Sequence, residues 1–173
     1  TFQQDLENLT NWGVQWGMHF NTKKCNIIRL SNSTKPLTMF YKMSGKILQE
    51  VELAQYLGVT IQNSLEFACH IRETAAKANK RLGFLKRNLK KTPTAVKKMA
   101  YSSLVRSGLE YGSVVWDPYT DSQTKAVEAV QNRAIRWMMG YSPRQRCSIT
   151  KLRAELGLHS LEERRLRQRL TFL

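Results

Sequence analysis

The sequence predicts an α+β fold: a small antiparallel sheet with one packed helix, followed by an all-α, basic remainder. Short apolar and β-branched runs separated by turn residues occupy positions 25–61. Beyond Asn63, apolar residues instead recur every three or four positions, which is typical of amphipathic helices. From His70 to Lys98 there are ten Lys or Arg and a single acid, Glu73. With 173 residues, the chain can form one sizeable core or two smaller ones.

The first predicted element is an amphipathic helix whose apolar positions are spaced by three and four residues. These positions are Phe2, Leu6, Leu9, Trp12 and Trp16. Gly13 and Gly17 weaken the end of the helix. We expect this helix to bury its tryptophans against the sheet that follows.

Short strands are predicted after this helix. They are Cys25–Leu30, Leu37–Met43, Lys46–Leu48 and Tyr56–Ile61. A turn at 32–36 separates the first two, and Ser44-Gly45 supplies a hairpin turn between the next two. Gly58 lies inside the last strand, at a point where a glycine marks close approach to the backbone.

The basic segment is predicted to begin with a long helix. Its apolar face comprises Ile71, Ala75, Ala78, Leu82, Leu85 and Leu89. Thr92-Pro93 predicts a new helix, with threonine as the N-cap and proline in the first turn. This second helix is expected to turn Val96, Ala100 and Leu104 inward and to break near Ser107-Gly108.

The last third is predicted to be helical as well, after an apolar stretch at 109–116 that stops at Asp117-Pro118. The apolar stripe of the next helix comprises Ala126, Val127, Val130, Ala134, Trp137 and Met138, and Gly140 closes it. A short helix with Ile149, Leu152 and Leu156 ends at Gly157. Ser160 and Glu163 form a capping box at the start of a final arginine-rich helix.

The strong positive charge of the chain indicates which kinds of partner it can bind. The net charge is +15 and the pI is about 10.1, which favours binding to a polyanion, with an acidic membrane surface as the alternative. The three cysteines are odd in number and far apart, so they predict no disulfide framework. No apolar run is long enough to cross a membrane, and no signal peptide is recognisable. We expect an intracellular protein, nuclear and cytoplasmic, that is part of a longer chain.

Several short motifs, in order, resemble the reverse transcriptases of non-LTR retrotransposons, LINE elements of the CR1, L2 and jockey type. The first motif comprises 6–16, Phe20-Asn21 and Lys24-Cys25, and the second is Tyr56-Leu57-Gly58-Val59. The third is 83–87, the fourth comprises Leu109-Glu110-Tyr111 and 115–118, and the fifth is 161–165. Each motif alone is weak evidence, but their order and spacing cover nearly the whole chain. The resemblance implies the C-terminal part of the polymerase: the end of the palm at 1–64, a basic thumb at 65–117, and a helical extension at 118–173.

The resemblance also implies roles for two sites. Lys24 corresponds to the lysine that protonates the departing pyrophosphate as a general acid; read alone, it is an ordinary surface lysine. Tyr56, Leu57, Gly58 and Val59 correspond to the primer grip, the hairpin that holds the growing 3′ end; read alone, they form a core strand with a glycine bulge.

The thumb would contact the phosphates of the template–primer duplex, an RNA template paired with a DNA primer. The candidate nucleic-acid-binding residues are Lys77, Lys80, Arg81, Lys86, Arg87, Lys90, Lys91, Lys97 and Lys98. A solvent-exposed charged face normally mixes both signs, and this one does not. Lys86-Arg87 and Lys90-Lys91 are alternatively a nuclear-import patch.

The carboxylates that bind metal ions in this family are missing from the sequence. Polymerase chemistry uses carboxylates that hold two Mg²⁺ ions, and reverse transcriptases supply an aspartate together with an adjacent Asp-Asp pair. This chain has only Asp5, Asp117 and Asp121, and none is adjacent to another. We therefore predict no metal site and no cofactor in this chain, with Mg²⁺ bound by the intact enzyme. Cys69-His70, Cys147 and His159 lack the spacing of a zinc site.

The functional hypothesis is thus a reverse transcriptase fragment that binds primer and template but is inactive alone, lacking the N-terminal fingers and palm. One alternative is a non-enzymatic nucleic-acid-binding protein derived from such an element. Another is a helical interaction module formed by 148–173.

Overall fold

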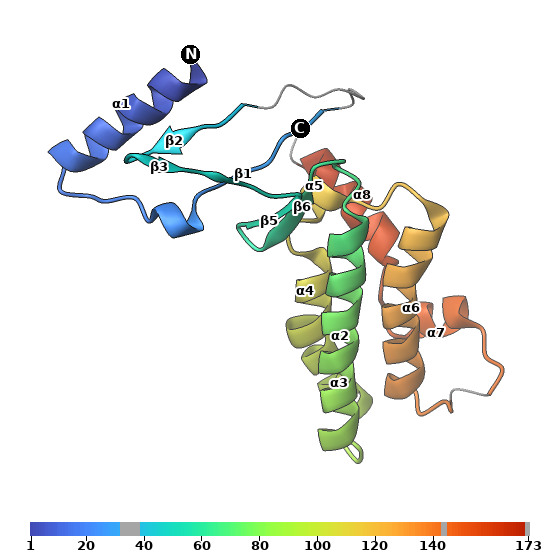
Figure 1. Ribbon diagram of the computed structural model, residues 1–173. Coiled ribbons are helices and arrows are strands. Elements are labelled where there is room, and N and C mark those ends of the chain that lie inside the picture. The colour runs from blue at the N-terminus through green and yellow to red at the C-terminus, as the bar shows by residue number, and fades with distance from the viewer. Residues whose placement is uncertain (32–38, 143–144, 172–173) are drawn as a thin grey trace. The chain divides into compact units, whose positions relative to one another are not determined.

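The computed structural model describes residues 1–31, 39–142 and 145–171, which form two units, Thr1–Glu66 and Phe67–Leu173 (Figure 1). The predicted α+β class is confirmed, because every strand among the described residues lies in the first unit and helices make up most of the second. No described helix is both long and apolar enough to cross a membrane.

The first unit combines a helix, α1 (Phe2–Gln15), and a 3-10 turn, η1 (Thr22–Lys24), with short strands. The strands are β1 (Asn26–Ile27), β2 (Lys42–Met43), β3 (Lys46–Ile47), β4 (Gln49–Glu50), β5 (Leu53–Tyr56) and β6 (Val59–Gln62). β2 pairs with β3 and β5 with β6 in antiparallel hairpins, whereas β1 pairs with β4 in parallel.

The single antiparallel sheet that the sequence predicts is therefore wrong. The described strands form separate two-stranded ladders. After the β2–β3 hairpin, the chain runs beside β1 in the same direction as β1, so β4 pairs with β1 in parallel. The hairpin turn at Ser44-Gly45 is confirmed, with φ of +50° and +74° at the two residues. The predicted turn at 32–36 and residues 37 and 38 of the predicted second strand lie outside the described residues.

α1 is confirmed, but its tryptophans are not buried. Trp12 and Trp16 are 47% and 66% exposed. The helix contacts β2 through its first turn instead: the Lys42 amide donates to Gln3 Oε1 at 2.9 Å. Gly13 is needed where the chain folds back, because a Cβ there would lie 2.7 Å from the carbonyl oxygen of Met18.

The second unit is a bundle built around a long helix, α2 (Ala68–Asn88). The other helices are α3 (Thr94–Tyr101), the π-helical turn η2 (Ser102–Arg106), α4 (Ser107–Glu110), α5 (Ser113–Trp116), α6 (Asp121–Met138), α7 (Ile149–Glu155) and α8 (Leu161–Thr171). α2 packs against α6 on one side and against α3, η2 and α4 on another (Figure 1). The predicted apolar face of α2 is confirmed as buried from Ile71 to Leu85.

The helix after α2 differs from the prediction in its start, its face and its end. Thr92 donates its hydroxyl to the carbonyl of Leu89 at 3.0 Å, and α3 begins at Thr94 without a side-chain cap. Tyr101, Val105 and Leu109 are buried, whereas Val96 and Leu104 are exposed. The inward face is already shifted at Val96 and Tyr101, before the π-helical turn begins at Ser102. The predicted break at Ser107-Gly108 does not occur, and α4 continues to Glu110.

The core of the second unit includes a buried polar network. The Tyr101 hydroxyl donates to Gln131 Oε1 at 2.8 Å, and Gln131 Nε2 donates to the carbonyl of His159 at 2.9 Å. Burial raises the pKa of the Tyr101 phenol. The network ties α3 and α6 to the segment before α8, and it satisfies polar groups that would be costly to bury unpaired.

α8 is held to the bundle by its arginines. Arg165, 1% exposed, places Nε 2.8 Å from Asp117 Oδ1, and Arg169 Nη1 lies 2.8 Å from Asp117 Oδ2. Arg164 pairs with Glu110. The Glu163 amide donates to Ser160 Oγ at 3.0 Å, so the serine half of the predicted capping box is confirmed. The Glu163 carboxylate pairs with His159 and Arg167.

Candidate nucleic-acid interface

Part of the predicted basic surface is an exposed stripe along α2, which we call the outer stripe: Lys77, Lys80, Phe84 and Arg87. Their spacings of three and four residues place them on one face of the helix, and all four are exposed. Phe84 is 56% exposed, so an aromatic ring lies among the cations. Glu73 Oε2 lies 3.7 Å from Lys77 Nζ, which offsets the positive charge at one end of the stripe only.

Arg81 and Lys86 lie beside the stripe, on opposite flanks of the helix. Arg81 Nη1 donates to the carbonyl of Leu104 at 3.4 Å and lies against Gly108. Lys86 is half-buried, and burial followed by the positive charge of Arg133 on α6 holds its pKa below the ordinary lysine value. The cations predicted on α2 therefore belong to more than one face. Sequence reasoning missed Arg133, because its proximity to Lys86 depends on how α6 packs on α2.

The cations beyond α2 also differ in their surroundings. Lys90 and Lys91 are exposed in the turn between α2 and α3. Lys97 Nζ lies 5.8 Å from the ring centroid of Trp137, a cation–π contact. Lys98 is half-buried and places its ammonium 3.7 Å from where a Cβ on Gly157 would lie.

Most carboxylates of the second unit form ion pairs with cations outside α2. No Asp or Glu occurs between positions 74 and 109. Glu110 and Asp117 pair with arginines of α8, and Glu128 pairs with Arg153 at 3.8 Å. Within the described ranges, no carboxylate pairs with Lys80, Lys86, Arg87, Lys90 or Lys91. This surface therefore carries uncompensated positive charge, which a phosphate backbone can neutralise.

The residues predicted as a primer grip lie at a hairpin tip. Tyr56 ends β5 and pairs with Val59 at the start of β6. Leu57 and Gly58 form the two-residue turn, with φ of +46° and +81°, as a type I′ turn requires. The continuous strand predicted over Tyr56–Ile61 is thus wrong, because two successive positive φ values reverse the chain. Tyr56 and Leu57 are 66% and 74% exposed, whereas Val59 is buried.

Lys24 ends the 3-10 turn η1, and its side chain is exposed. The turn is held by the Asn21 side chain, which accepts a hydrogen bond from the amide of Lys23 at 3.1 Å. Lys24 and Cys25 line an otherwise largely apolar pocket together with Phe20 and residues of α1. The described residues that line this pocket with Lys24 include no carboxylate.

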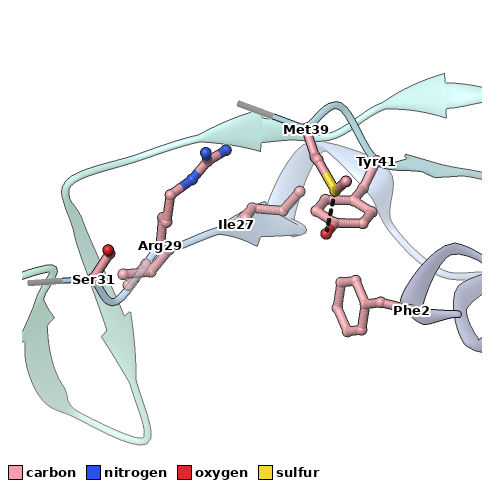
Figure 2. Close-up of a pocket in the computed structure, with 7 residues that line it drawn as sticks. Phe2, Ile27, Arg29, Ser31, Met39 and Tyr41 are labelled. Carbon is pink, nitrogen blue, oxygen red and sulfur yellow. Dashed lines mark hydrogen bonds between the residues drawn. The ribbon is translucent and has the colours of Figure 1, made fainter. Parts of the chain in front are cut away.

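Another pocket in the first unit, of about 460 Å³, is shown in Figure 2. Phe2 and Tyr41 stack edge to face at 4.9 Å, and the Tyr41 hydroxyl donates to the sulfur of Met39 at 3.6 Å. Among the described lining residues, the only charged group is Arg29, which pairs with Glu50 at 2.8 Å. The described lining therefore offers no free charged group to orient a ligand.

The aspartates do not fit a pair of Mg²⁺ ions. Asp117 forms ion pairs with two arginines, and Asp121 Oδ2 lies 4.0 Å from Lys125 Nζ. Asp5 lies in the first turn of α1. No cluster of three His, Cys, Asp or Glu side chains able to hold a metal is found in the described part of the chain.

Two of the four tryptophans lie in the second unit and differ in burial. Trp116 is fully buried and packs edge-on against His70 at 5.2 Å between ring centroids. Trp137 is half-buried beneath Lys97. Both therefore differ from the exposed tryptophans of α1, for which the predicted burial is wrong.

Comparison with curated proteins finds similarity to polymerases of mobile elements. The chain is 29% identical over 165 residues to a probable RNA-directed DNA polymerase from transposon BS of Drosophila melanogaster, covering 93% of this chain and 18% of the relative. It is 23% identical over 141 residues to the RNA-directed DNA polymerase from mobile element jockey of Drosophila melanogaster, covering 80% and 15%. A probable RNA-directed DNA polymerase from transposon X-element is 23% identical over 136 residues, covering 76% and 15%.

The chain spans less than a fifth of the length of these relatives. No family model and no solved structure matches it. The predicted resemblance is nevertheless confirmed by the relatives: the chain is homologous to part of the RNA-directed DNA polymerases of jockey-type, non-LTR retrotransposons.

Proposed function

We propose that this chain is a template–primer-binding part of a retrotransposon reverse transcriptase. The observation that carries the proposal is the surface of α2 and the α2–α3 turn, where Lys80, Arg87, Lys90 and Lys91 are exposed and none has a carboxylate partner among the described residues. Phosphate groups compensate such charge, and phosphate contacts position a protein on a duplex without reading its sequence. The partner is accordingly an RNA template paired with a DNA primer.

The hairpin tip fits the role of a primer grip. Tyr56 offers an exposed ring and hydroxyl for stacking or for a phosphate hydrogen bond, and Gly58 leaves backbone accessible at the tip. Lys24 has the exposed ammonium that a general acid toward pyrophosphate needs. In this proposal residues 1–64 belong to the palm, 65–117 to the thumb and 118–173 to a helical extension.

Catalysis is assigned to the intact polymerase, in the nucleus and cytoplasm, and not to this chain. The aspartates present lie apart in the sequence, and two of them are engaged by cations. Mg²⁺ would be bound by carboxylates that these residues do not supply. The proposal is therefore a nucleic-acid-binding part without polymerase activity of its own.

A non-enzymatic nucleic-acid-binding protein derived from such an element is the second candidate. Binding of this kind needs only the cations that this chain carries, and not the catalytic carboxylates. Both candidates predict the same surface and differ in whether the remainder of a polymerase acts with this chain.

One experiment tests binding and catalysis together. The purified chain is titrated into a fluorescent RNA–DNA hybrid with a recessed 3′ end, and anisotropy is followed from low to moderate salt. We expect binding that weakens steeply with salt, and no primer extension when Mg²⁺ and dNTPs are added. Absence of binding at low salt would refute the binding role, and measurable extension would refute the lack of catalysis.

A further inference from the structure

A pocket of about 420 Å³ lies between α2 and the segment formed by η2 and α4, which pack together in the second unit (Figure 1). Its wall on α2 consists of Arg81, Phe84 and Leu85, and its opposite wall consists of Ser103, Leu104 and Ser107. No carboxylate occurs among the described lining residues. The pocket therefore combines apolar side chains with two hydroxyl groups and one cation.

The apolar part of the pocket is open to solvent. Phe84 and Leu104, on opposite walls, are 56% and 52% exposed, whereas Leu85 is buried. Two large apolar side chains thus face each other's wall without being covered by the described protein, and one of them is an aromatic ring. A ligand with a flat apolar face would gain contact area there.

The polar part of the pocket is organised by the π-helical turn. Arg81 Nη1 donates to the carbonyl of Leu104 at 3.4 Å, and Ser107 Oγ donates to the carbonyl of Ser103 at 2.5 Å. The remaining guanidinium nitrogens of Arg81 and the Ser103 hydroxyl have no partner within the described ranges. π-Helical turns often occur at functional sites, and this one directs polar groups into a pocket.

The surroundings of the pocket select the chemistry of its ligand. Phe84 belongs to the outer stripe, four residues after Lys80 and three before Arg87. Neither cation has a carboxylate partner among the described residues. The fitting ligand is therefore a planar ring joined to negatively charged groups, as a nucleobase is joined to its phosphates. Aromatic side chains placed among cations bind single strands in this way.

We propose that this pocket binds one unpaired base of a single-stranded segment. The base stacks on Phe84, and Lys80 and Arg87 hold the adjoining phosphates. Arg81 and Ser103 donate to acceptors on the edge of the base. The base must be unpaired, because neighbouring pairs cover both faces of a base inside a duplex.

The inference rests on the proposed function and refines it. Phosphate contacts by the basic surface account for binding to any duplex, whereas the pocket adds a preference for a duplex that continues into a single strand. The template beyond the primer end is such a strand.

The test compares three RNA–DNA hybrids by anisotropy: one blunt, one with a single-stranded template overhang, and one with an abasic overhang of the same length. The two overhangs carry the same phosphate charge and differ only in their bases. Any difference in affinity between them therefore measures contacts to bases.

Three variants are compared with the wild type. Phe84→Leu keeps an apolar side chain but removes the ring, and Phe84→Trp keeps a ring that can stack. Tyr119→Leu is the matched control, because Tyr119 is an exposed aromatic residue of the same unit, 72% exposed, and is not among the described lining residues. Circular dichroism melts establish that every variant is folded.

We expect the wild type to bind the base-bearing overhang about fivefold to tenfold more tightly than the abasic one. Phe84→Leu should lose most of this difference, whereas Phe84→Trp should keep it and Tyr119→Leu should stay within about twofold of the wild type. The salt dependence of binding should be unchanged in Phe84→Leu, because that substitution removes no charge.

Two results would overturn the base pocket while leaving the proposed function intact. One is a wild type that binds the blunt hybrid but does not distinguish the two overhangs. The other is a Phe84→Leu variant that still distinguishes them as the wild type does. If the wild-type chain binds none of the hybrids at low salt, the proposed function itself fails, so the two failures are distinguishable.

Discussion

At the scale of single residues, packing lowers the pKa of two titratable side chains of α2, His70 and Lys86. His70 is buried against Trp116, and its Nε2 lies 3.3 Å from the Thr74 hydroxyl. Burial is the largest influence and lowers its pKa from 6.5; the charge of Glu73 opposes this shift and that of Lys77 adds to it. The folded state therefore disfavours the charged imidazole.

This shift predicts acid sensitivity. Below pH 6.5 the unfolded chain takes up a proton that the folded chain resists, so stability falls as the pH drops through that value toward the folded pKa. Urea unfolding at pH 7 and pH 5 should show a larger loss for the wild type than for His70→Gln, which keeps His19 and His159. Equal losses in the two proteins would contradict the assignment.

The lowered pKa of Lys86 predicts how binding depends on pH. Phosphate binding requires the charged ammonium, and Lys86 loses its proton at lower pH than an ordinary lysine. Lys86→Arg keeps the charge at every accessible pH. Raising the pH from 7 toward 9 should therefore weaken hybrid binding more in the wild type than in Lys86→Arg, as measured by anisotropy. Parallel pH profiles would show that Lys86 does not contact phosphate.

At the scale of elements, the β5–β6 hairpin carries local strain at its tip. Leu57 adopts a left-handed conformation that a side chain of its kind rarely takes, at a position where asparagine is preferred. Leu57→Asn should stabilise the hairpin by about 1 kcal/mol. Hydrogen exchange at the amides of 53–62 measures this stabilisation as slower exchange, whereas Leu57→Val should destabilise the hairpin and speed exchange. Unchanged protection in both variants would exclude strain at this turn.

The attachment of α8 depends on one buried charge pair. Arg165→Met removes the guanidinium paired with Asp117 and should lower the free energy of unfolding by about 3 kcal/mol. The loss is no larger because Asp117 keeps its ion pair with Arg169. Arg167→Met is the matched control on the same helix: its side chain is 60% exposed and its pair with Glu163 should matter by less than about 1 kcal/mol. Urea unfolding compares them. Equal costs would mean that α8 is not held by this pair.

The same elements show what the sequence could and could not predict. The helices α1, α2, α6, α7 and α8 follow from apolar periodicity and caps, which are local properties. The π-helical turn was missed because the buried positions before, in and after it keep a spacing of four residues, so the apolar pattern does not reveal it. The Leu57-Gly58 turn was missed because leucine is an unusual residue for positive φ. The electrostatic influence of Arg133 on Lys86 depends on the packing of α6 on α2, which no local pattern encodes.

At the scale of the whole molecule, each unit has its own character. In the first unit, buried apolar side chains are few and Trp12, Trp16 and Phe40 are exposed. The second unit encloses a continuous core from Ile71 to Leu161. Glu110 and Asp117 pair with arginines of α8, whereas Lys80, Arg87, Lys90 and Lys91, on α2 and the turn that follows, have no carboxylate partner among the described residues. Charge is thus segregated within one unit, as a phosphate-binding surface requires.

The salt dependence of hybrid binding tests this account most directly. One variant replaces Lys86, Arg87, Lys90 and Lys91 by alanine; its control replaces Lys42, Lys46, Lys125 and Lys151, which are exposed and carry the same total charge. If the basic surface contacts phosphates, the first variant should lower the slope of log affinity against log salt by about 2 to 4, and the control by less than about 1. Equal slopes in the two variants would show that net charge, and not this surface, accounts for binding.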